Sequence, residues 1–332
     1  MSVSIKDIAE KANVSPSTVS RALNDHPRIS ADTKAHIQDL AKTMDYVPSD
    51  LARSLVAQRS TTIGLAIADF LDPFCVGLIS SIEDALVNGT YHVFVSSFYR
   101  DRDRELALFD AFYERRLAGI IVVGSQVGKA HTAQRYRDNM PAVLINCPHY
   151  PYSVSVDQIM AARIAMEHLF ELGHRRIAYA QQDVSSTTGT ARLQSYLAAL
   201  SDHDIQVDER LIVRTQGGIM GGIKAVTQLV KLSQPPTAIL CFNDMMAMGV
   251  INALQQRGYV VPKDCSVVGF DDLETSSYYY PSLTTVRQPI YQLGQRAVDM
   301  LFRLVHGDEN VTLEVLDPKL VIRESTAPVM RR

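Results

Sequence analysis

The chain has few cysteines, and those it has lie far apart. Its 332 residues include four, Cys75, Cys147, Cys241 and Cys265. They have neither the short paired spacing of a zinc site nor the density of a disulfide-stapled domain. We therefore expect no metal and no disulfide framework, and the scattered thiols fit a reducing cytoplasm.

Long hydrophobic runs are also missing. No apolar stretch approaches the ~20 residues that cross a bilayer, and residues 1–4 lead straight into a helical pattern without a secretory signal. The sequence predicts a cytoplasmic protein with no membrane partner. With 46% hydrophobic residues, the chain can still fill more than one core.

The sequence also lacks an excess of charge of one sign. It has 33 lysines and arginines against 36 aspartates and glutamates, a net charge of -3, and its first 60 residues hold eight basic and seven acidic side chains. A strongly basic segment would have indicated nucleic-acid binding, because neutralised phosphates supply most non-specific affinity. Composition alone gives no such indication.

Catalytic signatures are absent as well. The chain has no GxSxG elbow, no HExxH helix and no cluster of cysteine and histidine. The glycine-rich run 217–222 lacks both the Lys-Ser or Lys-Thr of a nucleotide loop and the GxGxxG spacing of a dinucleotide site. We interpret this run as part of a cleft wall, and we expect neither an enzyme nor a bound cofactor.

The amino-terminal segment, in contrast, has a clear pattern of two short helices joined by a turn. Apolar residues recur at helical spacing twice, at Ile5, Ile8, Ala9 and Ala12 and then at Val19, Ala22 and Leu23. Ser15 can cap the second helix and Pro16 suits its first turn. A third helix over 31–44 would close a small core. The pattern predicts a helix-turn-helix, with an ordinary helical hairpin as the alternative.

The rest of the chain alternates short apolar strands with helices, which predicts parallel sheets with crossover helices. We expect strands at 63–68, 91–95, 119–123 and 142–145 with helices at 74–87 and 104–115. After Asp157 the pattern restarts, with strands at 177–180, 211–213, 238–242 and 266–270 and helices at 158–172, 192–200, 221–232 and 245–257. The fold class is thus an α-helical headpiece plus an α/β core of two doubly wound lobes.

Short motifs along the whole chain resemble those of the lactose repressor and purine repressor (LacI/GalR) family of bacterial transcription regulators. They include Tyr46-Val47-Pro48, Asp72-Pro73-Phe74, Gly173-His174-Arg175-Arg176-Ile177, Asn243-Asp244-Met245-Met246-Ala247, Gly269-Phe270-Asp271-Asp272 and Arg323-Glu324-Ser325-Thr326. The resemblance implies a core like a type I periplasmic binding protein, in which the chain crosses between the lobes three times. We expect these crossovers near Asp157, Gln288 and Lys319.

The resemblance also divides the chain. Residues 1–48 would form the helix-turn-helix headpiece and 49–60 a hinge helix and linker. Residues 61–157 with 290–318 would form the first lobe of the core, and 158–289 with 319–332 the second.

The resemblance assigns DNA contacts to five residues. Pro16, Ser17 and Arg21 match the base-reading positions of the recognition helix. Leu55, with Arg53, matches the part of the hinge that enters the minor groove, where an apolar wedge kinks the duplex. Leu55 could instead be a core residue of a linker helix. A hinge helix over 49–57 is too short to be stable alone, so we expect it to order when two copies pair on DNA.

Polar residues follow the predicted strands, where doubly wound sheets bind their ligands. By resemblance, seven residues would contact an effector: Asp72, Phe74 and Asn146 in the first lobe, and Arg192, Asn243, Asp271 and Gln288 in the second. Carboxylates, amides and an arginine suit a polyhydroxylated ligand, and an aromatic ring can cover its apolar face.

Each second-lobe residue also has a simpler interpretation. Asn243 could only cap a helix, Asp271 and Asp272 could form a turn, Gln288 could be a satisfied polar group, and Arg192 could lie on a solvated helix face. His174 is expected to be structural, at a helix end where a positive charge is favoured.

Two departures from the family bear on the ligand. Ser186 replaces an arginine of the purine-binding members, and Gly217 replaces an aromatic ring of both purine and galactoside binders. A purine would lose its stacking partner, so a sugar, a sugar phosphate or a nucleoside remains.

The interpretation we favour is a repressor that binds roughly palindromic double-stranded operator DNA as a homodimer. A metabolite bound between the lobes would control its operator affinity allosterically. The alternative is a cytoplasmic solute-sensing module whose headpiece contacts protein.

Overall fold

The computed structural model describes residues 3–46, 60–87, 89, 91–127, 140–182, 187–308 and 310–329. It separates into two compact units, Met1–Ser60 and Thr61–Arg332. None of the helices in these described ranges is long and apolar enough to cross a membrane.

The first unit is a bundle of three short helices, α1 (Ile5–Lys11), α2 (Pro16–Leu23) and α3 (Ala31–Thr43). Ser15 caps α2, because its hydroxyl accepts from the Thr18 backbone N–H at 3.1 Å, and Ser30 caps α3 in the same way. The three helices bury one apolar cluster, Ile8, Ala9, Val19, Ala22, Ile37 and Ala41. The predicted helix-turn-helix and its third helix are therefore present.

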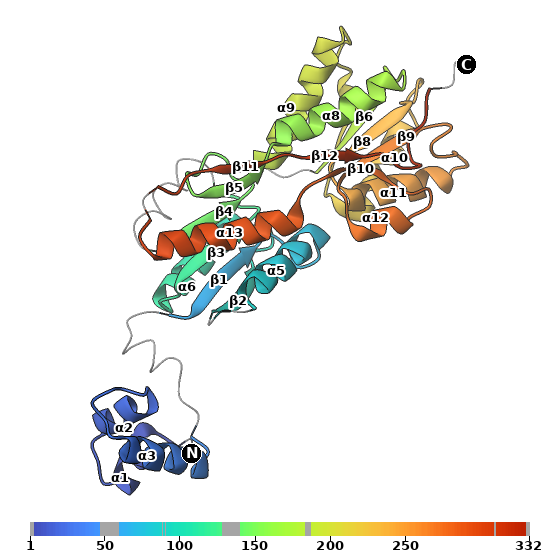
Figure 1. The fold of residues 1–332 in the computed structure, drawn as a ribbon. Coiled ribbons are helices and arrows are strands. Elements are labelled where there is room, and N and C mark those ends of the chain that lie inside the picture. The colour runs from blue at the N-terminus through green and yellow to red at the C-terminus, as the bar shows by residue number, and fades with distance from the viewer. Residues whose placement is uncertain are drawn as a thin grey trace. The chain divides into compact units, whose positions relative to one another are not determined.

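The second unit contains two parallel-sheet lobes (Figure 1). The first-lobe sheet has the order β11-β5-β4-β3-β1-β2, with β1 (Thr62–Ile67), β2 (His92–Ser97), β3 (Gly119–Val123), β4 (Ala142–Ile145), β5 (Ser153–Val156) and β11 (Glu314–Leu316). Its helices are α5 (Pro73–Leu86), α6 (Arg102–Glu114) and α13 (Ile290–Val305).

The second-lobe sheet has the order β12-β10-β9-β8-β6-β7. Its strands are β6 (Ile177–Gln182), β7 (Ile212–Thr215), β8 (Ala238–Cys241), β9 (Ser266–Asp271), β10 (Thr284–Arg287) and β12 (Lys319–Val321). All pair in parallel except β12, which is antiparallel to β10. Helices α8 (Gln158–Glu171) and α9 (Thr187–Asp202) cover one face, and α10 (Gly218–Leu229) and α11 (Asp244–Gln255) the other. A 3-10 turn (Glu209–Leu211) precedes β7, and the short helix α12 (Glu274–Tyr278) follows β9.

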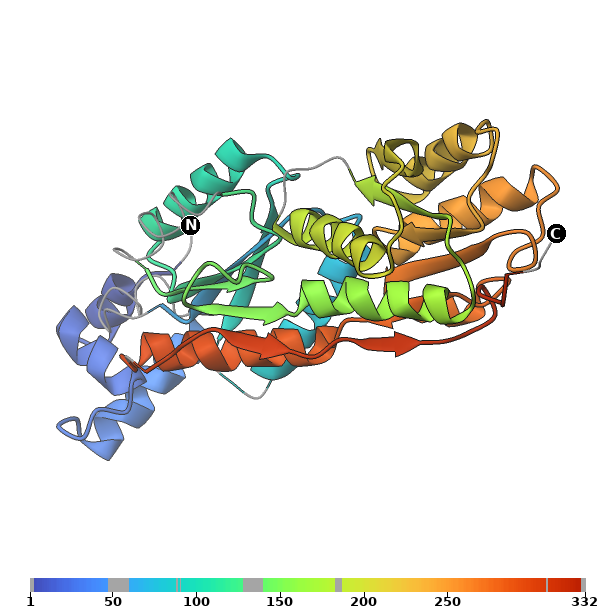
Figure 2. The same ribbon diagram turned by 90° about the horizontal axis from the view of Figure 1, so that it is seen from above.

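The chain passes between the two sheets three times. It leaves the first lobe between β5 and α8, returns between β10 and α13, and leaves again between β11 and β12. Figure 2 shows this last passage as the extended carboxyl-terminal segment that runs from one lobe to the other. The core thus has the predicted class of fold, with two doubly wound lobes joined by three connecting segments of the chain.

The glycine-rich run 217–222 has a different role from the predicted one. Gly217 precedes α10 with φ 82°, and a Cβ on Gly222 would lie 2.1 Å from the backbone oxygen of Met246. A Cβ on Gly249 of α11 would lie equally close to the backbone oxygen of Ile219. These glycines therefore let α10 and α11 approach closely, and none of them is among the residues that line the interlobe pocket.

Candidate functional site

The three predicted base-reading residues all lie on the exposed side of α2. Pro16 begins the helix, and Ser17 and Arg21 follow one turn apart, all of them exposed. Val19 and Ala22, on the opposite side, are fully buried in the headpiece core. The headpiece therefore presents a short polar face with one guanidinium. Leu55 and Arg53 lie outside the described residues.

The seven predicted effector contacts meet in one pocket between the two lobes. This pocket, of about 80 Å³, is lined by Asp72, Phe74, Asn146, Arg192, Asn243, Asp271 and Gln288. The same lining contains Ala68, Cys75, Arg100, Val123, Gly124, Gln126, Thr188 and Phe242. Most of these residues follow the carboxyl ends of strands, which is where parallel sheets place ligands.

In the first lobe, the pocket wall is built around the start of α5. One oxygen of Asp72 accepts from the Phe74 backbone N–H at 3.1 Å, and the other accepts from Arg100 at 2.8 Å. The Asn146 side-chain oxygen accepts from the Val156 backbone N–H at 2.9 Å. These bonds fix the carboxylate and the amide at the mouth of the first-lobe sheet.

Arg192 is the most deeply buried cation of the second lobe, with 2% of its surface exposed. Its Nε donates to Gln158 at 2.8 Å, and an Nη donates to the backbone oxygen of Phe242. Its guanidinium lies 5.0 Å from the centre of the Phe242 ring and 4.0 Å from that of Phe270. Burial lowers the pKa of Arg192, while the nearby Asp271 raises it. The solvated-face alternative is therefore wrong.

Asp271 faces Arg192 from the end of β9 and is also buried. It accepts from the Gln288 amide at 2.6 Å, and the Gln288 oxygen in turn accepts from Gln158 at 3.1 Å. Burial, followed by the charge of Asp244, raises the pKa of Asp271 well above its usual value. Hydrogen bonds thus connect Arg192, Gln158, Gln288 and Asp271, and this chain of four residues includes Gln158 beside the first crossover and Gln288 beside the second.

Asp271 and Asp272 both have left-handed backbone conformations, with φ of 116° and 58°. Such residues are strained and persist where neighbouring contacts hold them. Asp272 accepts from Arg287 and from Arg323, each at 2.6 Å. Asp271 is thus the last residue of β9 and part of the pocket lining, whereas Asp272 lies outside that lining and ties the segment after β9 to the chain beside two crossovers.

Sequence reasoning missed the carboxylate behind the pocket, Asp244. Its side chain is fully buried at the start of α11 and accepts from the Leu273 N–H, the Ser276 hydroxyl and the Thr285 hydroxyl. Burial raises its pKa to about 6. The neighbouring Asn243 accepts from the Met246 N–H at 2.9 Å, so it caps α11 as well as lining the pocket. Through its bonds to Leu273, Ser276 and Thr285, Asp244 holds β10 and the segment after β9 in place.

Glu105 was missed in the same way. It is buried in α6 and accepts from the Ser125 hydroxyl at 2.5 Å and the Gln126 N–H at 2.7 Å. These bonds position the loop after β3, which carries Gly124 and Gln126 of the pocket lining. Thr188, also in the pocket lining, could have been predicted, because it precedes Arg192 by about one helical turn and so lies on the same side of α9. Nothing in the sequence marks Glu105 as buried.

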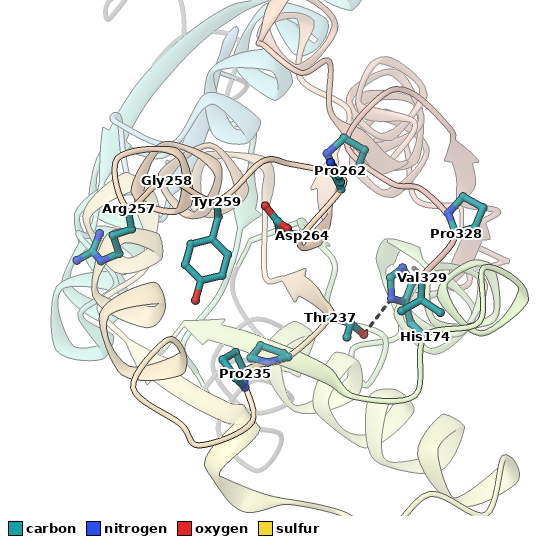
Figure 3. Close-up of a pocket in the computed structure, with 12 residues that line it drawn as sticks. His174, Pro235, Thr237, Arg257, Gly258, Tyr259, Pro262, Asp264, Pro328 and Val329 are labelled. Carbon is teal, nitrogen blue, oxygen red and sulfur yellow. Dashed lines mark hydrogen bonds between the residues drawn. The ribbon is translucent and has the colours of Figure 1, made fainter. Parts of the chain in front are cut away.

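A larger cavity of the core lies elsewhere. It has about 490 Å³ and is lined by residues that precede the strands of the second lobe, among them His174, Thr237 and Asp264 (Figure 3). This is the opposite edge of the sheet from the interlobe pocket. We place the ligand in the smaller pocket because its polar groups converge there, and because ligands bind at the carboxyl edge of such sheets.

His174 departs from its predicted charge state. Its side chain is buried, with 2% exposed, and contacts Thr237, Ser266 and the backbone oxygen of Ala327 at 3.0 to 3.1 Å. Burial lowers the pKa of His174, which favours the neutral ring over the cation expected at a helix end. The residue is structural, because it fastens the carboxyl-terminal segment to the second-lobe sheet.

Within the described ranges, no group of three histidine, cysteine, aspartate or glutamate side chains is arranged to hold a metal ion. A helix-turn-helix unit followed by a two-lobed binding core defines the class of the protein as a DNA-binding transcription regulator with an effector-binding core.

Comparisons with known proteins agree with this class. Residues 4–49 match the model of bacterial regulatory proteins of the lacI family, and residues 166–326 match a periplasmic binding protein-like domain. The chain is 32% identical over 326 residues to the HTH-type transcriptional repressor CytR of Escherichia coli K12, covering 97% of this chain and 96% of CytR.

Two solved structures are similar over nearly the full length. One is the lac repressor dimer bound to operator and the anti-inducer ONPF, with TM-score 0.88, 29% identity and coverage of 98% of this chain and 100% of that one. The other is a complex of the transcriptional regulator CelR with cellobiose, with TM-score 0.72, 25% identity and coverage of 97% and 99%.

The chain belongs to the LacI family of bacterial transcription regulators. It is a DNA-binding transcriptional repressor with a periplasmic-binding-protein-like effector core, in a family of regulators and not of enzymes. The family favours DNA over protein as the partner of the headpiece.

Proposed function

We propose that this repressor binds a roughly palindromic operator as a homodimer and that a small polyhydroxylated effector, held between the lobes, changes its operator affinity. The observation that carries the proposal is the convergence of seven predicted residues from both lobes on one pocket. The lac repressor structure, a dimer on operator, and the CelR complex with cellobiose support the same arrangement.

DNA reading is assigned to α2. Pro16, Ser17 and Arg21 would face the base edges of the major groove, and the arginine would donate two hydrogen bonds to a guanine. Leu55 and Arg53 of the hinge would enter the minor groove between the two half-sites. The headpiece would then be residues 1–48 and the hinge residues 49–60. The protein would act in the cytoplasm, because its operator lies on the bacterial chromosome.

Effector control is assigned to the interlobe pocket. Residues 61–157 with 290–318 and residues 158–289 with 319–332 would be the two lobes that close on the ligand. Asp271 contacts Gln288 and its neighbour Asp272 contacts Arg287 and Arg323, so a ligand at Asp271 would act directly on the chain near two crossovers. Operator and effector binding would then be coupled by ~1 to 3 kcal/mol.

The loop before α5 would form part of the dimer interface. Its adjacent apolar side chains Phe70 and Leu71 keep 44 and 87% of their surface exposed. Exposed apolar side chains that lie together mark interaction surfaces. A Leu71→Asp variant is expected to sediment as a monomer at concentrations where the parent protein is a dimer.

The DNA assignment is tested by selecting bound fragments from genomic DNA with the full-length protein and titrating the selected duplex at two salt concentrations. We expect specific binding with a steep salt slope. Arg21→Ala should bind the selected and a scrambled duplex equally. The matched control Lys42→Ala, which removes one exposed charge from α3, should keep the preference. An Arg21→Ala variant with unchanged preference would contradict the assignment.

A further inference from the structure

We infer that the effector is an uncharged polyhydroxylated molecule, a free sugar or a nucleoside, and that the pocket discriminates against phosphorylated ligands. This inference rests on the proposed function, because it assigns a chemical class to the ligand of the same interlobe pocket.

The first reason is the charge balance of the lining. Its charged side chains, among the described residues, are the carboxylates of Asp72 and Asp271 and the guanidiniums of Arg100 and Arg192. Each guanidinium already donates to a protein acceptor, Arg100 to Asp72 at 2.8 Å and Arg192 to Gln158 at 2.8 Å. A phosphate would bring close to two negative charges into a lining whose two guanidiniums already donate to acceptors of the protein.

The second reason is that two helix starts beside the pocket already hold acceptors of the chain itself. A helix start binds phosphate through its free backbone N–H groups. At α5 the Asp72 carboxylate accepts from the Phe74 N–H, and at α11 the Asn243 side-chain oxygen accepts from the Met246 N–H. These two helices therefore present side-chain oxygens, one of them a carboxylate oxygen, where a phosphate would bind.

The third reason is a carboxylate behind the wall. Asp244 is fully buried, and its charge adds to the effect of burial in raising the pKa of Asp271. The buried interior of the second lobe therefore disfavours ionisation of its own carboxyl groups, Asp244 and Asp271. A further anion at this place would meet repulsion across a medium of low dielectric, where charges interact more strongly than in water.

An uncharged polyol fits the same lining well. Asn146 and Asn243 contribute amides whose oxygens accept from backbone N–H groups, so that their side-chain nitrogens can donate to hydroxyl groups of a ligand. Phe74 from the first lobe and Phe242 from the second add ring surface for apolar faces of a sugar.

The test uses matched pairs of ligands that differ by one phosphate. The full-length protein is screened by thermal shift and then by calorimetry with D-ribose and ribose 5-phosphate, D-glucose and glucose 6-phosphate, and cytidine and cytidine 5′-monophosphate. For the pair that binds, we expect the neutral member to raise the melting temperature and the phosphorylated member to bind ~10-fold or more weakly, from the uncompensated charge.

Two variants at Gln126 test whether charge causes the preference for the neutral ligand. Gln126→Lys adds a cation to the half-buried lining, and Gln126→Met keeps a similar side-chain length without charge. We expect the lysine variant to lose most of the preference for the neutral member, while the methionine variant keeps it. Equal preferences in the two variants would overturn the electrostatic explanation and with it the inference.

The outcomes separate the inference from the proposed function. If the phosphorylated member of a pair binds as tightly as its neutral partner or more tightly, the inference is wrong while the effector pocket stands. If no member of any pair binds the parent protein, the proposed pocket itself is contradicted and the inference falls with it.

Discussion

The buried carboxylate of Asp244 makes the stability of this repressor depend on pH in a direction that can be measured. Burial raises its pKa from 3.8 to about 6 in the folded protein. Between these two values the unfolded chain has lost the proton while the folded chain still holds it. The contribution of Asp244 to the free energy of unfolding must therefore fall as the pH rises from about 4 to above 6.

The size of the effect follows from the shift. Each pKa unit corresponds to about 1.4 kcal/mol, so the charged carboxylate costs up to about 3 kcal/mol above pH 6. Asp244→Asn removes the titration and preserves the shape. The amide oxygen can accept from the Leu273 N–H, and the amide nitrogen can donate to the Thr285 hydroxyl. We expect the variant to gain stability relative to the parent protein as the pH rises, by up to that amount.

Urea unfolding followed by far-ultraviolet circular dichroism, from pH 4.5 to 8, measures the difference. Asp308→Asn is a control with a flat profile over this range, because the Asn310 N–H and Arg303 lower the pKa of Asp308 from 3.8, so its contribution to stability is already complete above pH 4.5. Parallel pH profiles for Asp244→Asn and the parent protein, or a variant that loses relative stability toward pH 8, would refute the reasoning.

Three further predictions concern packing and coupling. Gly222→Ala should lower the urea midpoint by an equivalent of about 1 to 3 kcal/mol, because its Cβ would meet the backbone of Met246, whereas Gly77→Ala in α5 meets only a side chain at 3.1 Å and should be nearly neutral. Asp272→Asn should destabilise the core by about 1 to 3 kcal/mol in the same assay, since Arg287 and Arg323 lose a charged partner and one of them faces an amide N–H in place of an acceptor oxygen. Asp271→Ala should keep operator affinity but abolish the calorimetric signal of the effector, and a retained signal would exclude its place in the pocket.

The sequence predicted the elements that repeat a strong local pattern. The long amphipathic helices and the apolar strands such as β3 are found close to their expected bounds. The expected elements did not include β5, β10 or β11, which have only three or four residues each and are ordered by pairing with distant chain. Helices α9 and α10 begin earlier than expected, since glycine and threonine do not mark an apolar face.

The pocket lining could be anticipated because it follows strand ends and family-like motifs, which are local features of the sequence. The groups behind it could not. Asp244 and Glu105 are buried only through long-range packing, and burial lowers the pKa of His174, whose ring contacts the backbone oxygen of Ala327, 153 residues away. Local sequence indicates which residues stand at the edge of a sheet, but it does not indicate what covers them.

The central claim is that a metabolite bound between the lobes changes the affinity of the headpiece for operator DNA. The most direct measurement is a fluorescence-anisotropy titration of the full-length dimer on its selected operator, without and with the neutral ligand that raises its melting temperature. The account predicts a change in operator affinity of ~5- to 150-fold in either direction. Superimposable titrations at saturating ligand would contradict it.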